Sequence, residues 1–214
     1  MAKPATQLWV LDDRRPNPRR IHKAAEVLDA GGVIAYPTDT VYGIGCDLHN
    51  RKAIDRIYRI KGLDRGHRLS FICQDLSNIA EYAYVTDFAY RWLRRLLPGP
   101  YTVVLQASRN VPKILLERRR EVGIRVPDNF TCLELTRALG RPIISTSATD
   151  PVTREILIDP EVVRERLGNR LDLVLDGGLL TNEPSTVVSL IEDEIKILRE
   201  GKGPVDLLVG QTPA

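Results

Sequence analysis

Hydrophobic residues recur along this chain at two spacings. Where they return every three or four residues we expect amphipathic helices, and short apolar runs bounded by Gly, Pro, Asn or Asp predict strands. The helical spacing and its capping residues predict helices over 17–31, 50–62, 86–96, 130–139 and 160–167, with a brief one starting at Asp75 or Ser77. The apolar runs predict strands over 33–37, 69–73, 101–106, 121–126, 142–146, 173–175, 185–189 and 195–198.

Helical and strand patterns alternate through most of the chain, and strands dominate its last third. This order predicts the α/β class, with a twisted, mixed open sheet and flanking helices. The length of 214 residues fits a single domain. We expect an N-terminal arm at 1–16, the domain itself at 17–206 and a C-terminal tail at 207–214. The arm holds one short apolar run, from Leu8 to Leu11.

The segment 33–45 changes from apolar to polar within a few residues. Pro37 cannot donate a hydrogen bond to a sheet, so the strand before it ends or runs on an edge there. The side chains that follow crowd one small volume: Thr38, Asp39, Thr40 and Tyr42. Open α/β sheets bind ligands at polar turns of this kind, although such a turn can also satisfy its own backbone. Gly43 and Gly45 permit a close approach by another strand or by a ligand.

Composition excludes several classes of protein. Only 6% of the residues are aromatic while 43% are hydrophobic, so the core must be aliphatic. The three cysteines are scattered and form no C-x-x-C motif, which argues against a disulfide framework or a zinc site and favours a reducing compartment. The N-terminus shows no apolar run long enough for a signal peptide, and nowhere do 18 apolar residues follow one another, so we expect neither a signal peptide nor a transmembrane helix. We therefore expect a cytoplasmic protein that does not enter a membrane.

Positive charge is concentrated in clusters, although the net charge is only +3. The basic clusters lie at 14–20, 51–68, 91–95 and 118–120, and arginine dominates them. A solvated surface balanced by Asp and Glu gives the same pattern. We nevertheless expect the 51–68 cluster to bind phosphate, because it follows the polar turn and guanidinium groups make bidentate phosphate contacts. The chain has no Walker A loop, G-x-G-x-x-G motif or nucleophile elbow, so any ATP phosphates would be held by arginine, lysine, hydroxyl and backbone N–H groups.

Seven short motifs follow one another through most of the chain. They are Tyr36–Gly45, Leu97–Leu105, Val122–Asp128, Pro142–Ala148, Leu173–Gly178, Pro184–Val188 and Leu198–Gly201. In content and order they resemble the motifs of the YrdC-like domain family, whose active members are L-threonylcarbamoyladenylate synthases. The resemblance implies a single YrdC-like domain with a basic, concave surface.

The resemblance also implies a reaction and its substrates. ATP, L-threonine and bicarbonate would be converted to threonylcarbamoyl-AMP and pyrophosphate, with Mg²⁺ on the ATP phosphates and no covalent enzyme intermediate. Because the product serves tRNA modification, tRNA is an expected partner. Catalysis of this kind depends on positioning and charge stabilisation, so we assign no single catalytic residue.

Residues are carried over from the family only where a motif matches. The resemblance assigns threonine binding to Thr38, Thr40, Tyr42, Arg125, Ser145 and Ser185. It assigns nucleotide binding to Lys61, Ser147 and Arg199, to which the neighbouring basic loop adds Arg65 and His67. Within these sets, Arg125 is expected to pair with the threonine carboxylate. His67 is either a phosphate contact or an exposed loop histidine.

Two positions depart from the family pattern. Leu63 stands where the family has the arginine of Lys-x-Arg, and Thr149 stands where it has the asparagine of Ser-x-Asn. Arg65 lies two residues beyond Leu63 and is near enough in sequence to compensate for the first loss. These changes resemble the YciO branch of the family. The alternative function is therefore a non-catalytic module of the same fold that binds double-stranded RNA or tRNA.

Overall fold

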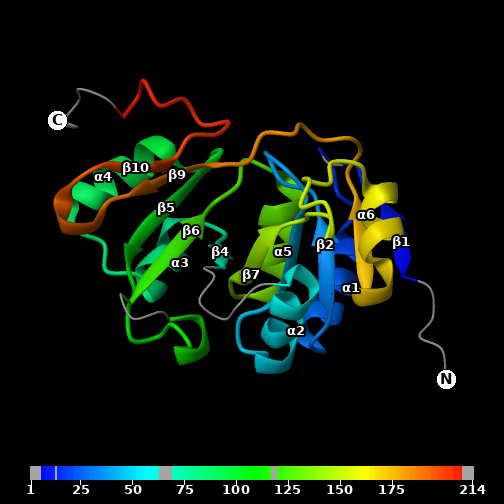
Figure 1. Ribbon diagram of the computed structural model, residues 1–214. Helices are drawn as coiled ribbons and strands as arrows, with labels where there is room; N and C mark the ends of the chain where they lie inside the picture. Colours follow the sequence, from blue (N-terminus) through cyan, green and yellow to red (C-terminus); the bar gives the residue numbers. More distant parts are fainter. Residues whose placement is uncertain (1–5, 13, 63–68, 117–119, 209–214) are drawn as a thin grey trace.

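The computed structural model describes residues 6–12, 14–62, 69–116 and 120–208. These residues form a ten-stranded sheet in the order β1-β8-β2-β3-β7-β4-β6-β5-β9-β10, with helices against its faces (Figure 1). The strands are β1 (Gln7–Val10), β2 (Val33–Tyr36), β3 (Gly43–Asp47), β4 (Ser70–Ile72), β5 (Tyr101–Gln106), β6 (Glu121–Arg125), β7 (Ile143–Ser147), β8 (Leu173–Asp176), β9 (Thr186–Ser189) and β10 (Lys196–Arg199). The α-helices are α1 (Pro18–Asp29), α2 (Arg51–Lys61), α3 (Leu76–Tyr82), α4 (Asp87–Leu96), α5 (Phe130–Leu139) and α6 (Pro160–Leu167).

The helices begin and end where local capping signals predict. The side chains of Asn17 and Asn50 accept hydrogen bonds from the backbone N–H groups of Arg19 and Ala53, which caps the first turns of α1 and α2. Helix α2 ends at Gly62, whose backbone is left-handed. The expected helices are confirmed. They could be predicted because capping signals act over only a few residues.

The N-terminal segment belongs to the sheet. β1 pairs in parallel with β8 from Gln7, opposite Leu173, to Val10, opposite Asp176. The apolar run that the sequence places in an arm is therefore an edge strand, and β10 forms the opposite edge.

Strand β3, which the sequence pattern does not predict, lies near the centre of the sheet. It pairs antiparallel with both β2 and β7. A Cβ atom on Gly45 would lie 2.5 Å from Cγ2 of Ile143 and 2.9 Å from Cε1 of Tyr36. The close approach that Gly43 and Gly45 permit is therefore to neighbouring strands and to the Tyr36 ring.

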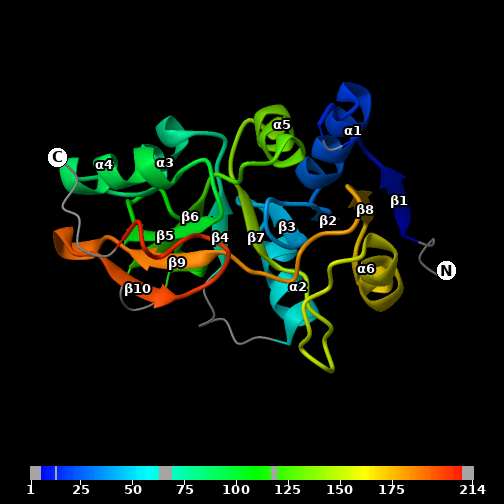
Figure 2. The ribbon, with the colours of Figure 1, turned by 90° about the horizontal axis from the view of Figure 1, so that it is seen from above.

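Helices cover both faces of the half of the sheet that runs from β1 to β7 (Figure 2). α1 and α5 lie on one side and share a core with Ile34 and Ile143, whereas α2 and α6 lie on the other. In the other half, α3 contacts β4 through Tyr82 and Phe71, whose ring centroids are 5.6 Å apart. The two halves of the sheet meet where β7 pairs with β4.

The central strands β7, β4 and β6 have two unlike faces. One face is buried in the main core and carries, in register, Ile144, Phe71 and Ile124. The other face carries, in the adjacent register positions, Ser145, Ser70 and Gly123. Because these residues are small, this face leaves room for a cavity.

The expected fold, an α/β mixed open sheet with flanking helices, is confirmed. The basic concave surface stays a prediction. Within the described ranges, no helix combines the length and the apolar character that crossing a bilayer requires.

Candidate functional site

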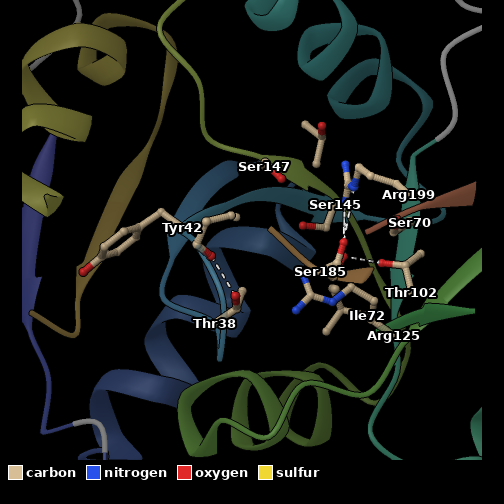
Figure 3. Close-up of a pocket in the computed structure, with 13 residues that line it drawn as sticks. Thr38, Tyr42, Ser70, Ile72, Thr102, Arg125, Ser145, Ser147, Ser185 and Arg199 are labelled. Carbon is tan, nitrogen blue, oxygen red and sulfur yellow. Dashed lines mark hydrogen bonds between the residues drawn. The ribbon is translucent and has the colours of Figure 1, made fainter. Parts of the chain in front are cut away.

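A cavity of about 110 Å³ lies over the small-residue face (Figure 3). Its lining residues come from strands and loops that are distant in sequence: Thr38, Val41, Tyr42, Gly43, Ser70, Ile72, Thr102, Arg125, Ser145, Thr146, Ser147, Ser185 and Arg199. Hydroxyl and guanidinium groups dominate this lining. Such a cavity suits a small polar ligand that carries negative charge.

The polar turn after β2 is held by its own side chains. The buried hydroxyl of Thr38 donates to the carbonyl oxygen of Val41 at 2.7 Å and accepts from the backbone N–H of Thr40 at 3.0 Å. The two threonine hydroxyls also lie 3.0 Å apart. The turn therefore satisfies part of its own backbone, as one of the two interpretations of the sequence predicts, and it also forms one wall of the cavity.

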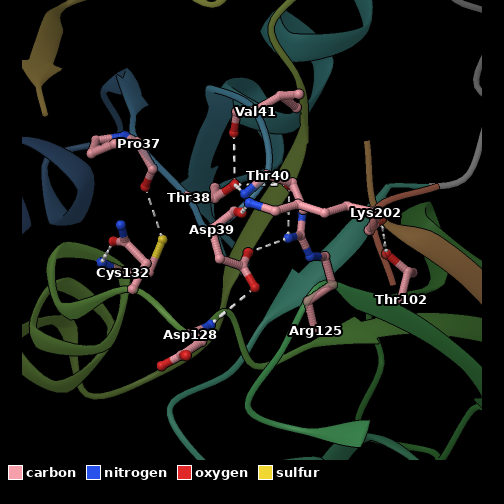
Figure 4. Close-up of polar contacts among 12 residues, drawn as sticks. Pro37, Thr38, Asp39, Thr40, Val41, Thr102, Arg125, Asp128, Cys132 and Lys202 are labelled. Atoms are coloured by element: carbon pink, nitrogen blue, oxygen red, sulfur yellow. Dashed lines mark hydrogen bonds and ion pairs between the residues drawn. The ribbon is translucent and has the colours of Figure 1, made fainter. Parts of the chain in front are cut away.

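Arg125 links this turn to β6 (Figure 4). Its Nη2 donates to Oδ1 of Asp39 at 2.7 Å and to the hydroxyl of Thr40 at 3.0 Å. The other carboxylate oxygen of Asp39 accepts from the backbone N–H of Asp128 at 3.1 Å. The side chains of Arg125 and Asp39 are each only 9% exposed, so this is a buried ion pair. The Nε atom of Arg125 is also buried, and no described residue accepts a hydrogen bond from it.

The opposite wall of the cavity is formed by Ser185, Thr102 and Arg199. The hydroxyls of Ser185 and Thr102 lie 2.8 Å apart. The guanidinium of Arg199 donates to the carbonyl oxygen of Ser185 at 2.7 Å and to its hydroxyl at 3.3 Å. Burial, together with the charge of nearby Arg125, lowers the pKa of Arg199. Two guanidinium groups therefore face one cavity while a single carboxylate, Asp39, pairs with one of them.

Lys61 lies beside the cavity, at the end of α2. Its buried ammonium donates to the carbonyl oxygen of Ser147 at 2.8 Å and to the hydroxyl of Thr149. Burial and the charge of Arg154 lower the pKa of this lysine to about 8. The threonine that replaces the family's asparagine thus holds Lys61 in place through its hydroxyl.

Tyr42 lines the cavity, but its hydroxyl is hydrogen-bonded to backbone outside it. Its hydroxyl donates to the carbonyl oxygen of Gly178 at 2.7 Å and accepts from the backbone N–H of Gly177 at 3.1 Å. In Figure 3 this hydroxyl points away from the centre of the cavity. Two further contacts tie the C-terminal segments to the turn: Thr181 donates to the carbonyl oxygen of Thr40 and Lys202 donates to that of Asp39.

The structure brings most of the predicted site residues together. Those that line the cavity are Thr38, Tyr42, Arg125, Ser145, Ser147, Ser185 and Arg199. Thr40 and Lys61 contact this lining through Arg125 and Ser147. Arg65 and His67 lie outside the described residues, as does Leu63. The individual ligand roles stay predictions.

Sequence reasoning missed several residues of the site. Ser70 and Thr102 line the cavity, and Lys202 contacts the turn, but none of these was nominated. Alternation along each strand would have indicated the first two, because they share a face with Gly123 and Arg125. No local signal predicts the contact of Lys202, since Asp39 is far away in sequence.

The expected Mg²⁺, carried on the ATP phosphates, stays a prediction. Within the described part of the chain, no group of three His, Cys, Asp or Glu side chains is placed to hold a metal ion. The described residues that line the cavity include no carboxylate, and Asp39, which contacts this lining, is already paired with Arg125 and with a backbone N–H. The donor set therefore fits a cation that is carried by phosphate oxygens and water rather than one held in a protein cage.

Comparison of the sequence places the chain among known proteins. A family model described as telomere recombination, Sua5/YciO/YrdC, matches residues 26–201. An uncharacterized protein of Haemophilus influenzae is 42% identical over 92% of this chain and 97% of its own. YciO of Escherichia coli is 39% identical over 94% of this chain and 98% of its own. A threonylcarbamoyl-AMP synthase of Vibrio vulnificus is 32% identical over 73% of this chain and 86% of its own.

Solved structures agree with these matches. The crystal structure of E. coli YciO superposes with a TM-score of 0.89 and covers 94% of this chain and 98% of its own. The crystal structure of P. abyssi Sua5 in complex with L-threonine also gives a TM-score of 0.89, at 27% identity. It covers 97% of this chain, and this chain spans 62% of that longer one.

Proposed function

Because this chain belongs to the Sua5/YciO/YrdC family, we propose that it converts ATP, L-threonine and bicarbonate to threonylcarbamoyl-AMP and pyrophosphate for tRNA modification. The synthase named among its relatives and the Sua5 structure that contains L-threonine support this assignment. The activity is either that of a full synthase or that of a weak paralogue. We also propose that it acts in the cytoplasm.

The observation that carries the proposal is the unused hydrogen-bonding capacity of Arg125. Its Nε atom is buried and has no acceptor among the described residues, and leaving a charged donor in that state is costly. Burial lowers the pKa of Arg199, and Arg125 lies near enough for its charge to lower that pKa further. A substrate carboxylate placed between the two guanidinium groups would supply the missing acceptor.

The rest of the lining supports an amino acid that carries a hydroxyl and a methyl group. The hydroxyls of Thr38, Ser145 and Ser185 offer donors and acceptors, whereas Val41 and Ile72 supply apolar contacts. L-Threonine has both groups on its β-carbon. In this proposal the contacts that favour threonine over serine are those made by its methyl group.

The site contributes to the reaction by positioning and by charge. The threonine amine forms a carbamate, either with carbon dioxide and loss of a proton or with bicarbonate and loss of water. The carbamate oxygen then attacks the α-phosphorus of ATP and displaces pyrophosphate. Both reactants are anions, so the cationic groups of Arg125, Arg199 and Lys61 reduce their repulsion. When bound with ATP, Mg²⁺ neutralises further phosphate charge. We assign the protein the orientation of the two substrates and no covalent step.

The test is pyrophosphate release that depends on threonine. The protein is incubated with ATP, Mg²⁺ and bicarbonate, with L-threonine, L-serine or no amino acid. We expect release with threonine, less with serine and none without an amino acid. Arg125→Gln should abolish release, while Arg91→Ala, an exposed residue of α4, should leave it unchanged. Pyrophosphate release that is the same with and without threonine would contradict the proposal and favour the non-catalytic RNA-binding alternative.

A further inference from the structure

Two cationic residues, Lys61 and Arg154, contact each other at the C-terminal end of α2. The ammonium of Lys61 is fixed by the carbonyl oxygen of Ser147 and the hydroxyl of Thr149. The guanidinium of Arg154 donates through Nη1 to the backbone carbonyl oxygen of the same lysine. Ser147 lines the cavity, so the ammonium of Lys61 lies next to it, and Arg154 is linked to the cavity through Lys61.

The loop that carries Arg154 is built to hold it there. The backbone of Arg154 is left-handed (φ 67°), a conformation that residues with a side chain adopt only when their surroundings impose it. Its N–H donates to the carbonyl oxygen of Asp150 at 3.0 Å, and the loop is closed by an antiparallel bridge between Thr149 and Ile156. The carboxylate of Asp150 accepts from backbone N–H groups within the loop and caps it.

The guanidinium of Arg154 lies against the end of α2. Gly62 ends this helix with φ 56°, a conformation that glycine adopts readily. A Cβ atom at this position would lie 3.4 Å from Nη2 of Arg154, which is an ordinary van der Waals contact. The guanidinium therefore packs against the backbone of Lys61 and Gly62, near enough to the Lys61 ammonium for its charge to act on it.

The charge of this pair is not compensated by a carboxylate. Among the described residues, neither Lys61 nor Arg154 forms an ion pair. The two carboxylates of the same loop are otherwise engaged: Asp150 accepts from its own loop and lies 3.8 Å from Arg166, and Glu155 accepts from Thr153. The charge of Arg154, after burial, contributes to the lowered pKa of Lys61. Holding two cations together in this way is unfavourable unless an anion binds them.

We infer that Arg154 is the second cation of a phosphate subsite, and that with Lys61 it clamps the β- and γ-phosphates of the nucleotide. This inference rests on the proposed function, which supplies the nucleotide. It also explains how the chain can lack the arginine of the Lys-x-Arg motif, since Leu63 stands in its place. A guanidinium from the 149–156 loop would replace one from the segment after α2.

The experiment is calorimetry with MgATP, inorganic pyrophosphate, AMP and L-threonine. It compares the wild type with three variants. Arg154→Asn removes the charge but keeps a residue that accepts the left-handed backbone. Arg154→Lys keeps the charge but loses the bidentate fork. Arg164→Ala, on α6 and paired with Glu161 at the surface, is the matched control.

We expect Arg154→Asn to weaken the binding of MgATP and pyrophosphate by about 10- to 100-fold, as the loss of a charged hydrogen bond does. AMP and L-threonine should bind as they do to the wild type, and Arg154→Lys should fall between the two. Unchanged thermal unfolding would show that the variants are folded.

The outcomes separate this inference from the proposed function. If the wild type binds MgATP and Arg154→Asn binds it equally well, the inference is wrong while the proposed function stands. If the wild type binds pyrophosphate in an Arg154-dependent manner but neither ATP nor threonine, the phosphate subsite stands and the proposed function is wrong. If Arg164→Ala weakens the binding of MgATP and pyrophosphate as much as Arg154→Asn does, the loss reflects general surface charge and the inference is wrong.

Discussion

Asp39→Asn tests the buried ion pair that joins the polar turn to β6. The substitution removes the carboxylate charge but keeps an oxygen that can accept from the backbone N–H of Asp128. Arg125 would retain its contact with the hydroxyl of Thr40, while its charge would lose its partner. Removing one member of a buried ion pair costs about 3 to 5 kcal/mol, and we expect the lower end, about 3 kcal/mol, because each side chain is 9% exposed.

The assay is urea unfolding at pH 7 together with a thermal melt. For a chain of this size, a loss of about 3 kcal/mol corresponds to a melting temperature lower by about 6 to 12 °C. Asp29→Asn is the matched control, since Asp29 pairs with Arg141 through a side chain that is 66% exposed, and it should cost less than about 1 kcal/mol.

A second measurement separates charge from packing. In Asp39→Asn the guanidinium of Arg125 is left without a counter-ion, so sulfate should raise the melting temperature of this variant more than that of the wild type. The double variant Asp39→Asn, Arg125→Gln should be less destabilised than the sum of the two single variants. If Asp39→Asn unfolds within about 1 kcal/mol of the wild type and ignores sulfate, the pair does not have the energetic role argued from its burial.

Three other predictions follow from the site. Because the pKa of Lys61 is lowered to about 8, its ammonium loses its proton above that pH, so pyrophosphate should bind fully below pH 8 and more weakly above it. Lys61→Arg stays charged and should remove this dependence, as calorimetry between pH 6.5 and 9.5 would show (the range spans about 1.5 units on each side of the lysine pKa). Leu63→Arg restores a family cation and should tighten ATP binding by about 10-fold or more, and an unchanged Kd would mean that position 63 does not face the nucleotide. If the basic clusters bind tRNA, the affinity should fall with salt by a log–log slope of about −0.9 per duplex phosphate contacted, and equal, salt-independent binding of a single-stranded oligonucleotide would refute this.

The helices and most strands are predictable because their signals are local. Asn17, Asn50 and Gly62 act on neighbouring backbone groups, so a short stretch of sequence is enough to place the boundaries of α1 and α2. β1 is different, because its partner β8 is more than 160 residues away, and a four-residue apolar run has no periodicity to distinguish an arm from an edge strand.

β3 could not be predicted for a related reason. Gly43 and Gly45 are poor strand formers, so the segment resembles a flexible loop when it is taken alone. In the fold, the Tyr36 ring and Ile143 occupy the space where side chains at these positions would lie. The glycines are therefore explained by tertiary neighbours that no local pattern reveals.

Some features of the site could likewise be predicted from the sequence, and others could not. The order of the motifs predicts that Thr38, Arg125 and Arg199 belong to one site, and they line one cavity. The ion pair of Arg125 with Asp39 and the approach of Arg154 to Lys61 were not predicted, because each contact joins positions more than 80 residues apart. Such contacts are set by strand register and loop conformation rather than by the residue types themselves.

The space for the cavity comes from small residues on the sheet, and not from the charged residues that would contact a ligand. β7, β4 and β6 place Ser145, Ser70 and Gly123 side by side in register, while their other face is filled by large side chains. Charged groups then enter this space only from strand ends, as Arg125 and Arg199 do. The shape of the site and its charge therefore come from different positions of the chain.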